Sequence, residues 1–193
     1  MNTLDESLTN AVKEGRLLES SLTNIRLLLA GTKSPVARQA VEELAAAGQW
    51  QELNDRFYKT LAFGTGGLRG RTIGNVVTAA EEGKGGVNGR PDYPCVGTAC
   101  MNYFNVGRAL RGLIIYVKKH VEATDPGRKP RLVIGHDTRH FSRDFAEFCA
   151  GIGTDLGCDV YLFDSPRATP EISFAIRELN ADSGVVQTAC HNP

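Results

Sequence analysis

The feature that most constrains the fold is a regular alternation of apolar strands and amphipathic helices between residues 131 and 188. The three predicted strands span residues 132–135, 160–163 and 184–188. The helical segments between them begin at Ser142 and at Thr169-Pro170, which are residue types typical of helix N-termini. Strands that alternate with helices of this length predict an α/β domain with a parallel sheet and right-handed crossovers.

The N-terminal third of the chain is predicted to be helical. Apolar residues recur there at helical spacing, and Ser34-Pro35 predicts an N-cap followed by a proline in the first turn. No residue pattern in this part indicates chemistry. We expect residues 1–60 to form an N-terminal helical segment that packs on a main domain at 61–193. Within that domain, Thr98 is the predicted N-cap of a long helix.

Charge and composition exclude several classes of partner. Lys plus Arg and Asp plus Glu number 22 each, and no block of like charge stands out. Nucleic acid and anionic membranes both require a concentrated basic surface, so neither is an expected partner. The apolar stretches are far shorter than the roughly 20 residues that span a bilayer. The N-terminus has no basic region followed by an apolar core, as a signal peptide would. These observations predict a soluble, cytoplasmic, globular protein.

The five cysteines are scattered and include no Cys-x-x-Cys pair. This pattern favours reduced thiols over a disulfide framework or a zinc site. Cys149 and Cys158 fit the apolar pattern of the predicted core, and we expect them to be inert. Cys190 differs from them because it follows the last predicted strand and precedes His191.

A glycine-rich stretch at residues 63–71 reads Phe-Gly-Thr-Gly-Gly-Leu-Arg-Gly-Arg. Its glycines allow the backbone to approach a ligand closely, and Thr65, Arg69 and Arg71 can supply hydrogen bonds. The spacing fits neither the Rossmann fingerprint nor a P-loop. A plain surface turn would explain the glycines equally well, and the two arginines favour an anion-binding loop.

Two further clusters of polar residues each follow a predicted strand. Residues 135–139 read Gly-His-Asp-Thr-Arg, and residues 188–193 read Thr-Ala-Cys-His-Asn-Pro. In an open α/β sheet, ligands bind at the carboxyl ends of the strands, where both clusters would lie. Cys190 is a potential nucleophile there and His191 a potential proton carrier. Arg139 is as well suited to pairing with Asp137 or Asp144 as to contacting a ligand.

Taken in this order and at these distances, the three motifs resemble the first domain of the α-D-phosphohexomutases. Their phosphoglucomutase/phosphomannomutase branch is the most similar, and the resemblance covers the chain from about residue 50 to its end. It implies a three-layer α/β/α domain with a mixed, largely parallel sheet, preceded by N-terminal helices. Residues 61–193 would be domain I of such an enzyme, ending after the catalytic loop.

The resemblance also implies a reaction. The hallmark loop of the family reads Thr-Ala-Ser-His-Asn-Pro, and its serine carries a phosphoryl group. Members are intramolecular phosphotransferases that interconvert hexose 1-phosphate and hexose 6-phosphate, of glucose or mannose, through a phosphoenzyme and a 1,6-bisphosphate intermediate. Implied cofactors are Mg²⁺, held by an aspartate-rich loop of a later domain, and hexose 1,6-bisphosphate as activator. Implied partners are hexose phosphates and the remaining domains of the same enzyme.

Four residues of this chain receive roles from the resemblance. Cys190 occupies the phosphoserine position, which is also where a bound phosphoryl group would meet the metal. His191 follows it and would orient groups or transfer a proton. Arg69 would contact phosphate, and Thr65 would assist it.

The sequence departs from the family pattern at Cys190 and in lacking the motifs of the later domains. A thiol is more nucleophilic than an alcohol, but sulfur is a poor ligand for magnesium. We therefore expect this chain to be inactive alone. Two alternatives stay open. One is a naturally short module that binds sugar phosphates or regulates a partner. The other is a thiol nucleophile, Cys190 with His191, although adjacent residues rarely orient as such a pair.

Overall fold

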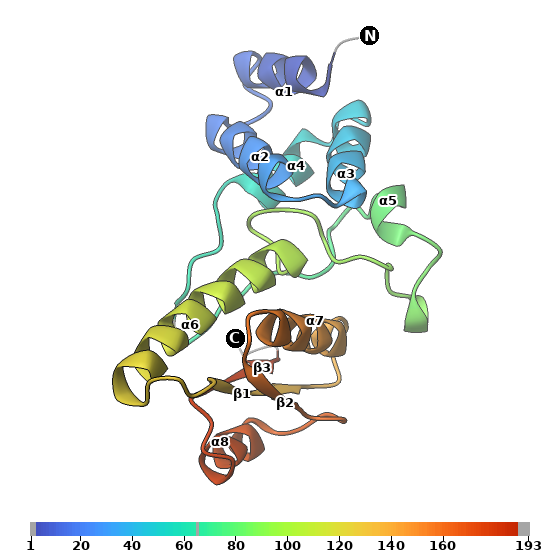
Figure 1. Ribbon diagram of the computed structural model, residues 1–193. Helices are drawn as coiled ribbons and strands as arrows, with labels where there is room; N and C mark the ends of the chain where they lie inside the picture. The colour runs from blue at the N-terminus through green and yellow to red at the C-terminus, as the bar shows by residue number, and fades with distance from the viewer. Residues whose placement is uncertain (1–2, 65, 189–193) are drawn as a thin grey trace. The chain divides into compact units, whose positions relative to one another are not determined.

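A computed structural model describes residues 3–64 and 66–188 (Figure 1). The chain divides into two compact units, Met1–Asn105 and Val106–Pro193. The division predicted after residue 60 stays a prediction. Within the described residues, no helix is long and apolar enough to cross a membrane.

The first unit is mainly helical. Its helices are α1 (Leu4–Lys13), α2 (Glu19–Gly31), α3 (Pro35–Ala46), α4 (Trp50–Phe57), the short α5 (Ala79–Glu82) and a 3₁₀ turn, η1 (Val87–Gly89). Leu8, Ile25, Val41, Leu53 and Phe57 are buried together in its core. Pro35 occupies the first turn of α3, as predicted, but the Ser34 side chain makes no capping hydrogen bond. The helical character predicted for residues 1–60 is confirmed.

The long helix α6 (Tyr103–Thr124) begins four residues later than predicted. The Thr98 hydroxyl does not cap it and instead donates to the Lys59 carbonyl oxygen at 2.8 Å. Asn102 takes the capping role, since its Oδ1 accepts from the Asn105 amide at 3.1 Å. The backbone before it is held in a non-helical path, because the Met101 amide donates to the Arg71 carbonyl oxygen.

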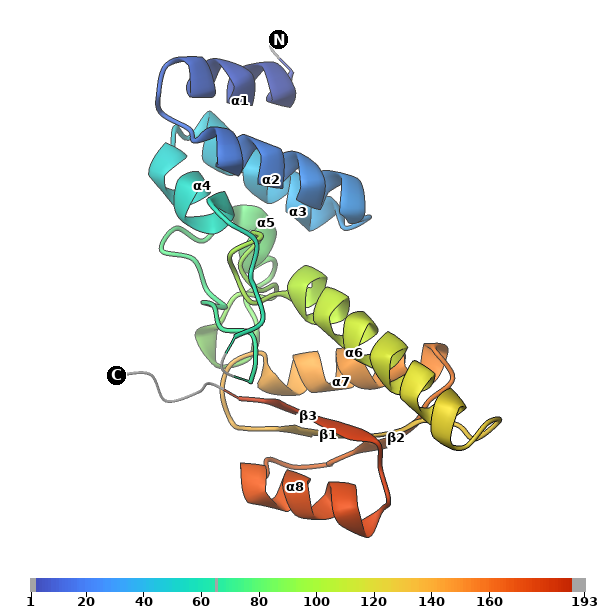
Figure 2. The same cartoon turned by 90° about the vertical axis from the view of Figure 1, so that its left-hand side faces the viewer.

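The second unit contains a three-stranded parallel sheet between helices (Figure 2). Its elements after α6 are β1 (Arg131–His136), α7 (Ser142–Asp155), β2 (Asp159–Leu162), α8 (Thr169–Glu178) and β3 (Ser183–Gln187). The strand order is β2-β1-β3, and β1 pairs in parallel with both neighbours. Helix α7 covers one face of the sheet and α8 the other, as Figure 2 shows. The predicted three-layer α/β/α fold is confirmed.

Small residues let the layers approach one another. A Cβ atom added to Gly184 would lie 2.5 Å from Cδ1 of Ile176 in α8, and one added to Gly135 would collide with Ile172. On the opposite face, a Cβ atom on Gly153 of α7 would lie 2.8 Å from Cγ2 of Val160. Close packing of this kind fixes the sheet between its helices.

Candidate functional site

The carboxyl ends of β1 and β3 lie side by side. His136 pairs with Gln187 in the register of the two strands. The next residues, Asp137 and Thr188, therefore emerge at the same edge of the sheet. The Asp137 amide continues the ladder by donating to the Gln187 carbonyl oxygen at 3.1 Å. The topology thus brings two of the three predicted motifs together.

The carboxylate of Asp137 joins three segments at this edge. Its Oδ1 accepts from the Ser142 hydroxyl at 2.5 Å and from the Arg139 amide at 3.0 Å. Its Oδ2 accepts from the Thr188 hydroxyl at 2.9 Å and lies 3.8 Å from Nε of Arg139. Of the alternatives left open for Arg139, the structure shows the pairing with Asp137. We call Asp137, Arg139, Ser142 and Thr188 the Asp137 cluster.

Sequence reasoning missed Asp137 as the centre of this cluster. Ser142 was predicted to cap α7, but the N-cap residue is Phe141, which adopts a left-handed conformation with φ of 66°. Ser142 is the first helical residue, and its hydroxyl bonds to Asp137 instead. The available signal was a carboxylate, Asp137, directly after a strand. A hydroxyl residue, Ser142, begins the helix that follows, and another, Thr188, begins the loop after β3. Such short polar side chains favour local bonds near backbone termini.

Thr188 is the first residue of the Thr-Ala-Cys-His-Asn-Pro motif and the last that the structure describes. Cys190 and His191 lie outside the described residues, as does Thr65 of the glycine-rich stretch. The roles predicted for these three residues stay predictions. What the structure adds is a fixed starting point for the motif, held by Asp137.

The glycine-rich stretch forms a tight turn in the first unit. Gly64 and Gly67 exchange two backbone hydrogen bonds of 3.0 Å each. Between them, Gly66 has φ of 80°, a conformation that favours glycine. Arg69 follows this turn and is exposed. Arg69 belongs to the first unit, whereas the Asp137 cluster belongs to the second.

Arg71 forms an ion pair that was not predicted. Its Nη2 lies 3.0 Å from Oε1 of Glu52, and that carboxylate is almost fully buried. Because Arg71 already neutralises Glu52, its charge is less available to a phosphate than its position suggested. The phosphate contact predicted for Arg69 stays a prediction.

A buried ion network underlies the loop and was not predicted. Arg56 is fully buried and donates to Glu52 at 2.7 Å and to Glu81 at 2.6 Å. It also donates to the carbonyl oxygens of Val76 and Val96. With Arg71, the network balances two carboxylates against two guanidinium groups, as buried charges require. The available signal was Glu52 and Arg56 four residues apart on the buried face of a short helix.

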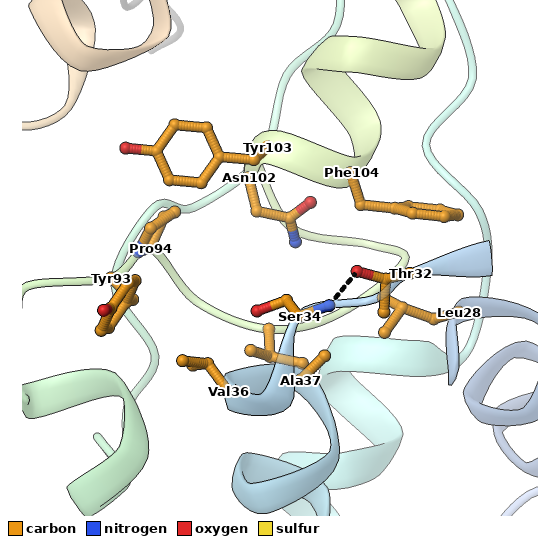
Figure 3. A pocket seen from close by; sticks show the side chains of 11 residues that line it. Leu28, Thr32, Ser34, Val36, Ala37, Tyr93, Pro94, Asn102, Tyr103 and Phe104 are labelled. Atoms are coloured by element: carbon orange, nitrogen blue, oxygen red, sulfur yellow. Dashed lines mark hydrogen bonds between the residues drawn. The ribbon is translucent and has the colours of Figure 1, made fainter. Parts of the chain in front are cut away.

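A small pocket in the first unit does not contain the predicted site residues (Figure 3). It is mostly apolar and lies among residues such as Leu28, Val36, Tyr93 and Phe104. Its volume of about 90 Å³ is well below the roughly 300–1,000 Å³ typical of ligand pockets. We therefore do not assign it to a sugar phosphate. Across residues 3–64 and 66–188, no three His, Cys, Asp or Glu side chains gather as a metal site would require.

Comparisons with known proteins agree with the geometry. The family model described as phosphoglucomutase/phosphomannomutase, α/β/α domain I, matches residues 94–193, just over half of the chain. A phosphoglucomutase of Staphylococcus epidermidis (strain ATCC 12228) is 36% identical over 143 residues, which are 74% of this chain and 21% of the relative. A phosphoglucomutase of Staphylococcus aureus (strain bovine RF122) is 33% identical over 142 residues, with the same coverage of 74% and 21%. The chain therefore spans about a fifth of the length of these curated relatives. No solved structure matches it.

Proposed function

Because the chain belongs to the phosphoglucomutase/phosphomannomutase family, we propose that it supplies the N-terminal domain of a phosphohexomutase. Such an enzyme interconverts hexose 1-phosphate and hexose 6-phosphate, and its substrate here would be glucose or mannose phosphate. The observation that carries the proposal is the family match over residues 94–193, which contain both the Asp137 cluster and the motif at 188–193. The domain boundary at residue 61 and the cytoplasmic location belong to the same proposal.

The Asp137 cluster would position the phosphoryl-transfer loop. Phosphoryl transfer depends mainly on the placement and charge of the groups around the phosphorus atom. Asp137 fixes Thr188, two residues before position 190, near the carboxyl end of β1 and the first residue of α7. His191 would then orient the phosphoryl group or move a proton, and Arg69, assisted by Thr65, would neutralise phosphate charge.

The side chains of residues 3–64 and 66–188 offer no magnesium site by themselves. In the described part of the chain no three candidate ligands gather. At position 190 the chain carries a thiol, which is a softer and poorer ligand for Mg²⁺ than oxygen. In the proposed enzyme, Mg²⁺ would be held by an aspartate-rich loop of a later domain, and hexose 1,6-bisphosphate would be the intermediate.

Cys190 also favours a second candidate function. With a thiol in place of the serine, the phosphoryl cycle would lose its usual acceptor, while Arg69 and the tight turn at Gly64–Gly67 would still bind phosphate. The chain would then be a module that binds sugar phosphates without converting them. Both candidates share phosphate binding and differ in turnover.

Binding of glucose 1-phosphate to the chain, followed by calorimetry, tests the shared part of the proposal. We expect saturable binding that weakens at least about tenfold in Arg69→Ala, which corresponds to the loss of one charge-assisted contact. Arg38→Ala is the matched control, since Arg38 is an exposed arginine of α3 that pairs with Glu42. The proposal fails if the chain does not bind the ligand, or if both variants bind it as tightly as the unmodified chain.

A further inference from the structure

Two cysteines of the first unit lie in direct contact. The Cys95 thiol donates to Sγ of Cys100, and the two sulfur atoms are 3.1 Å apart. Both residues are buried, with exposed fractions of 2% and 0%. A disulfide bond joins sulfur atoms at about 2.0 Å, so bond formation would require an approach of only about 1 Å. The sequence predicted scattered reduced thiols and gave no reason to pair these two.

The surroundings distinguish the two thiols. The hydrogen bond from Cys95 lowers the pKa of the Cys100 thiol; burial opposes this effect, and the cations of Arg56 and Arg71 reinforce it. A thiolate is the reactive form of cysteine. Cys100 is therefore the nucleophile of the pair, and Cys95 is placed to react with it in a second step.

We propose that Cys95 and Cys100 are a redox modification site that forms a reversible disulfide with a small oxidant of the peroxide class. The Cys100 thiolate attacks one oxygen of hydrogen peroxide, the O–O bond breaks, and a sulfenic acid forms. The other oxygen leaves as hydroxide and takes up the proton that Cys100 released on ionisation, which gives the first water. Sγ of Cys95 then attacks the Cys100 sulfur, the S–O bond breaks, and the thiol proton leaves with the hydroxide as a second water. In sum, two thiols are oxidised and one peroxide is reduced to two waters.

Residues next to the pair line an open depression, from which a molecule as small as peroxide would approach. An open depression in the first unit is lined in part by Arg71 and Ala99. Ala99 is half-buried and directly precedes Cys100. Glutathione disulfide is much larger than peroxide and would not reach a fully buried sulfur atom by this route. The burial of both thiols thus selects the size of the oxidant.

The modification would act at the base of the glycine-rich loop. The Cys95 amide donates to the Thr72 carbonyl oxygen at 2.8 Å, and the Met101 amide donates to that of Arg71 at 2.9 Å. The positive charge of Arg71 also helps to lower the pKa of the Cys100 thiol. Oxidation would remove the negative charge of the Cys100 thiolate from beside Arg71. Arg71 lies two residues after Arg69 and three residues before Gly74. An effect on phosphate binding rests on the proposed function, whereas disulfide formation does not.

Peptide mapping after peroxide treatment tests the proposal on the unmodified chain. Trypsin releases residues 85–108 as one peptide with both cysteines, because Arg90 precedes Pro91 and resists cleavage. After treatment, denaturation and alkylation with iodoacetamide, we expect this peptide to lack two hydrogen atoms and both alkyl groups, and dithiothreitol to reverse the change. The peptide of residues 144–167, with Cys149 and Cys158, is the internal control and should stay doubly alkylated.

Single variants test the order of the steps. In Cys95→Ala, peroxide should leave a sulfenic acid on Cys100 that dimedone traps, whereas Cys100→Ala should leave no dimedone adduct on Cys95. The proposal is overturned if the peptide of the unmodified chain stays doubly alkylated or gains oxygen atoms instead of losing hydrogen. It is equally overturned if the bond formed joins either residue to a different cysteine. None of these outcomes depends on hexose phosphate binding.

Discussion

At the scale of single residues, Asp137 is the acceptor that holds the Asp137 cluster together. Its carboxylate accepts hydrogen bonds from Ser142, Arg139 and Thr188, so its removal leaves three donors at the sheet edge without that acceptor. We expect Asp137→Ala to lower the free energy of unfolding by about 1–3 kcal/mol. Urea denaturation followed by circular dichroism measures this change.

The matched control for Asp137→Ala is Asp155→Ala. Asp155 is an exposed carboxylate at the end of α7 in the same unit. Its replacement should change the free energy of unfolding by less than about 0.5 kcal/mol. Equal effects of the two variants would mean that the Asp137 cluster does not stabilise the unit.

The second prediction at the residue scale concerns Gly74, which lies against the buried ion network. A methyl group there would collide with the guanidinium group of Arg56 and lie 2.8 Å from Oε1 of Glu52 and 2.9 Å from the Val76 carbonyl oxygen. Because Arg56 is held by several hydrogen bonds, it cannot move aside freely. We expect Gly74→Ala to destabilise the first unit by about 1–3 kcal/mol in urea denaturation.

Gly67→Ala is the control for Gly74→Ala. An added methyl group at Gly67 meets nothing within 4 Å, and its φ is not in the left-handed region. This variant should stay within about 0.5 kcal/mol of the unmodified chain. If Gly74→Ala were equally neutral, the network would be looser than its short contacts indicate.

At the scale of elements, an ion pair before the sheet gives a pH-dependent prediction. Arg128, in the loop before β1, donates to both carboxylate oxygens of Asp182, at 2.6 and 3.0 Å, and the Arg131 amide adds a third bond. The hydrogen bond from Arg128 lowers the pKa of Asp182, which burial opposes and the Arg131 amide reinforces. Asp182 directly precedes β3, so these contacts fix the entry of that strand.

The sign of the pH effect follows from the lowered pKa. The folded state binds the proton of Asp182 less tightly than the unfolded state, so the pair stabilises the unit above the unfolded value of about 3.9. This contribution is lost as the pH falls below that value and through the folded pKa. The urea midpoint of the unmodified chain should therefore fall more steeply between pH ~5 and pH ~3 than that of Asp182→Asn. Parallel profiles for the two proteins would refute the contribution.

The elements themselves were largely predictable from the sequence, because burial on a sheet or helix leaves a periodic apolar pattern. The strands near Val133, Val160 and Val185 and the helix at Thr169 lie where that pattern placed them. Helix starts were less predictable. Thr98 looks like a cap locally, but its hydroxyl donates to Lys59, 39 positions away, and the Ser142 hydroxyl donates to Asp137 in the preceding loop.

The candidate site was predictable only as a set of motifs. Alternation placed residues 135–139 and 188–193 at one edge of the sheet, and the register of β1 and β3 agrees. The sequence could not reveal that Asp137 accepts from Thr188, because the two are 51 positions apart and nothing local links them. The contact of Cys95 with Cys100 was hidden for another reason: the two are only five residues apart, but their approach depends on the folded path of the loop between them.

At the scale of the whole molecule, the proposed function depends on position 190 and on parts of the enzyme beyond this chain. The chain spans about a fifth of the relatives that it resembles. The decisive measurement therefore uses a polypeptide in which this sequence is joined to the later domains of a phosphoglucomutase. Glucose 1-phosphate is the substrate, and glucose 6-phosphate formation is followed with a coupled dehydrogenase.

In that polypeptide, Cys190→Ser should raise kcat by at least about 100-fold, because an alcohol oxygen restores a hard ligand and the usual phosphoryl acceptor. Cys190→Ala should abolish turnover, and Cys158→Ser should leave it unchanged, since Cys158 lies in the core of the second unit. If neither the serine variant nor the unmodified protein turns over while both bind glucose 1-phosphate, the binding-module function is the correct one. Equal and rapid turnover of both would instead mean that a cysteine at position 190 supports the phosphoryl cycle.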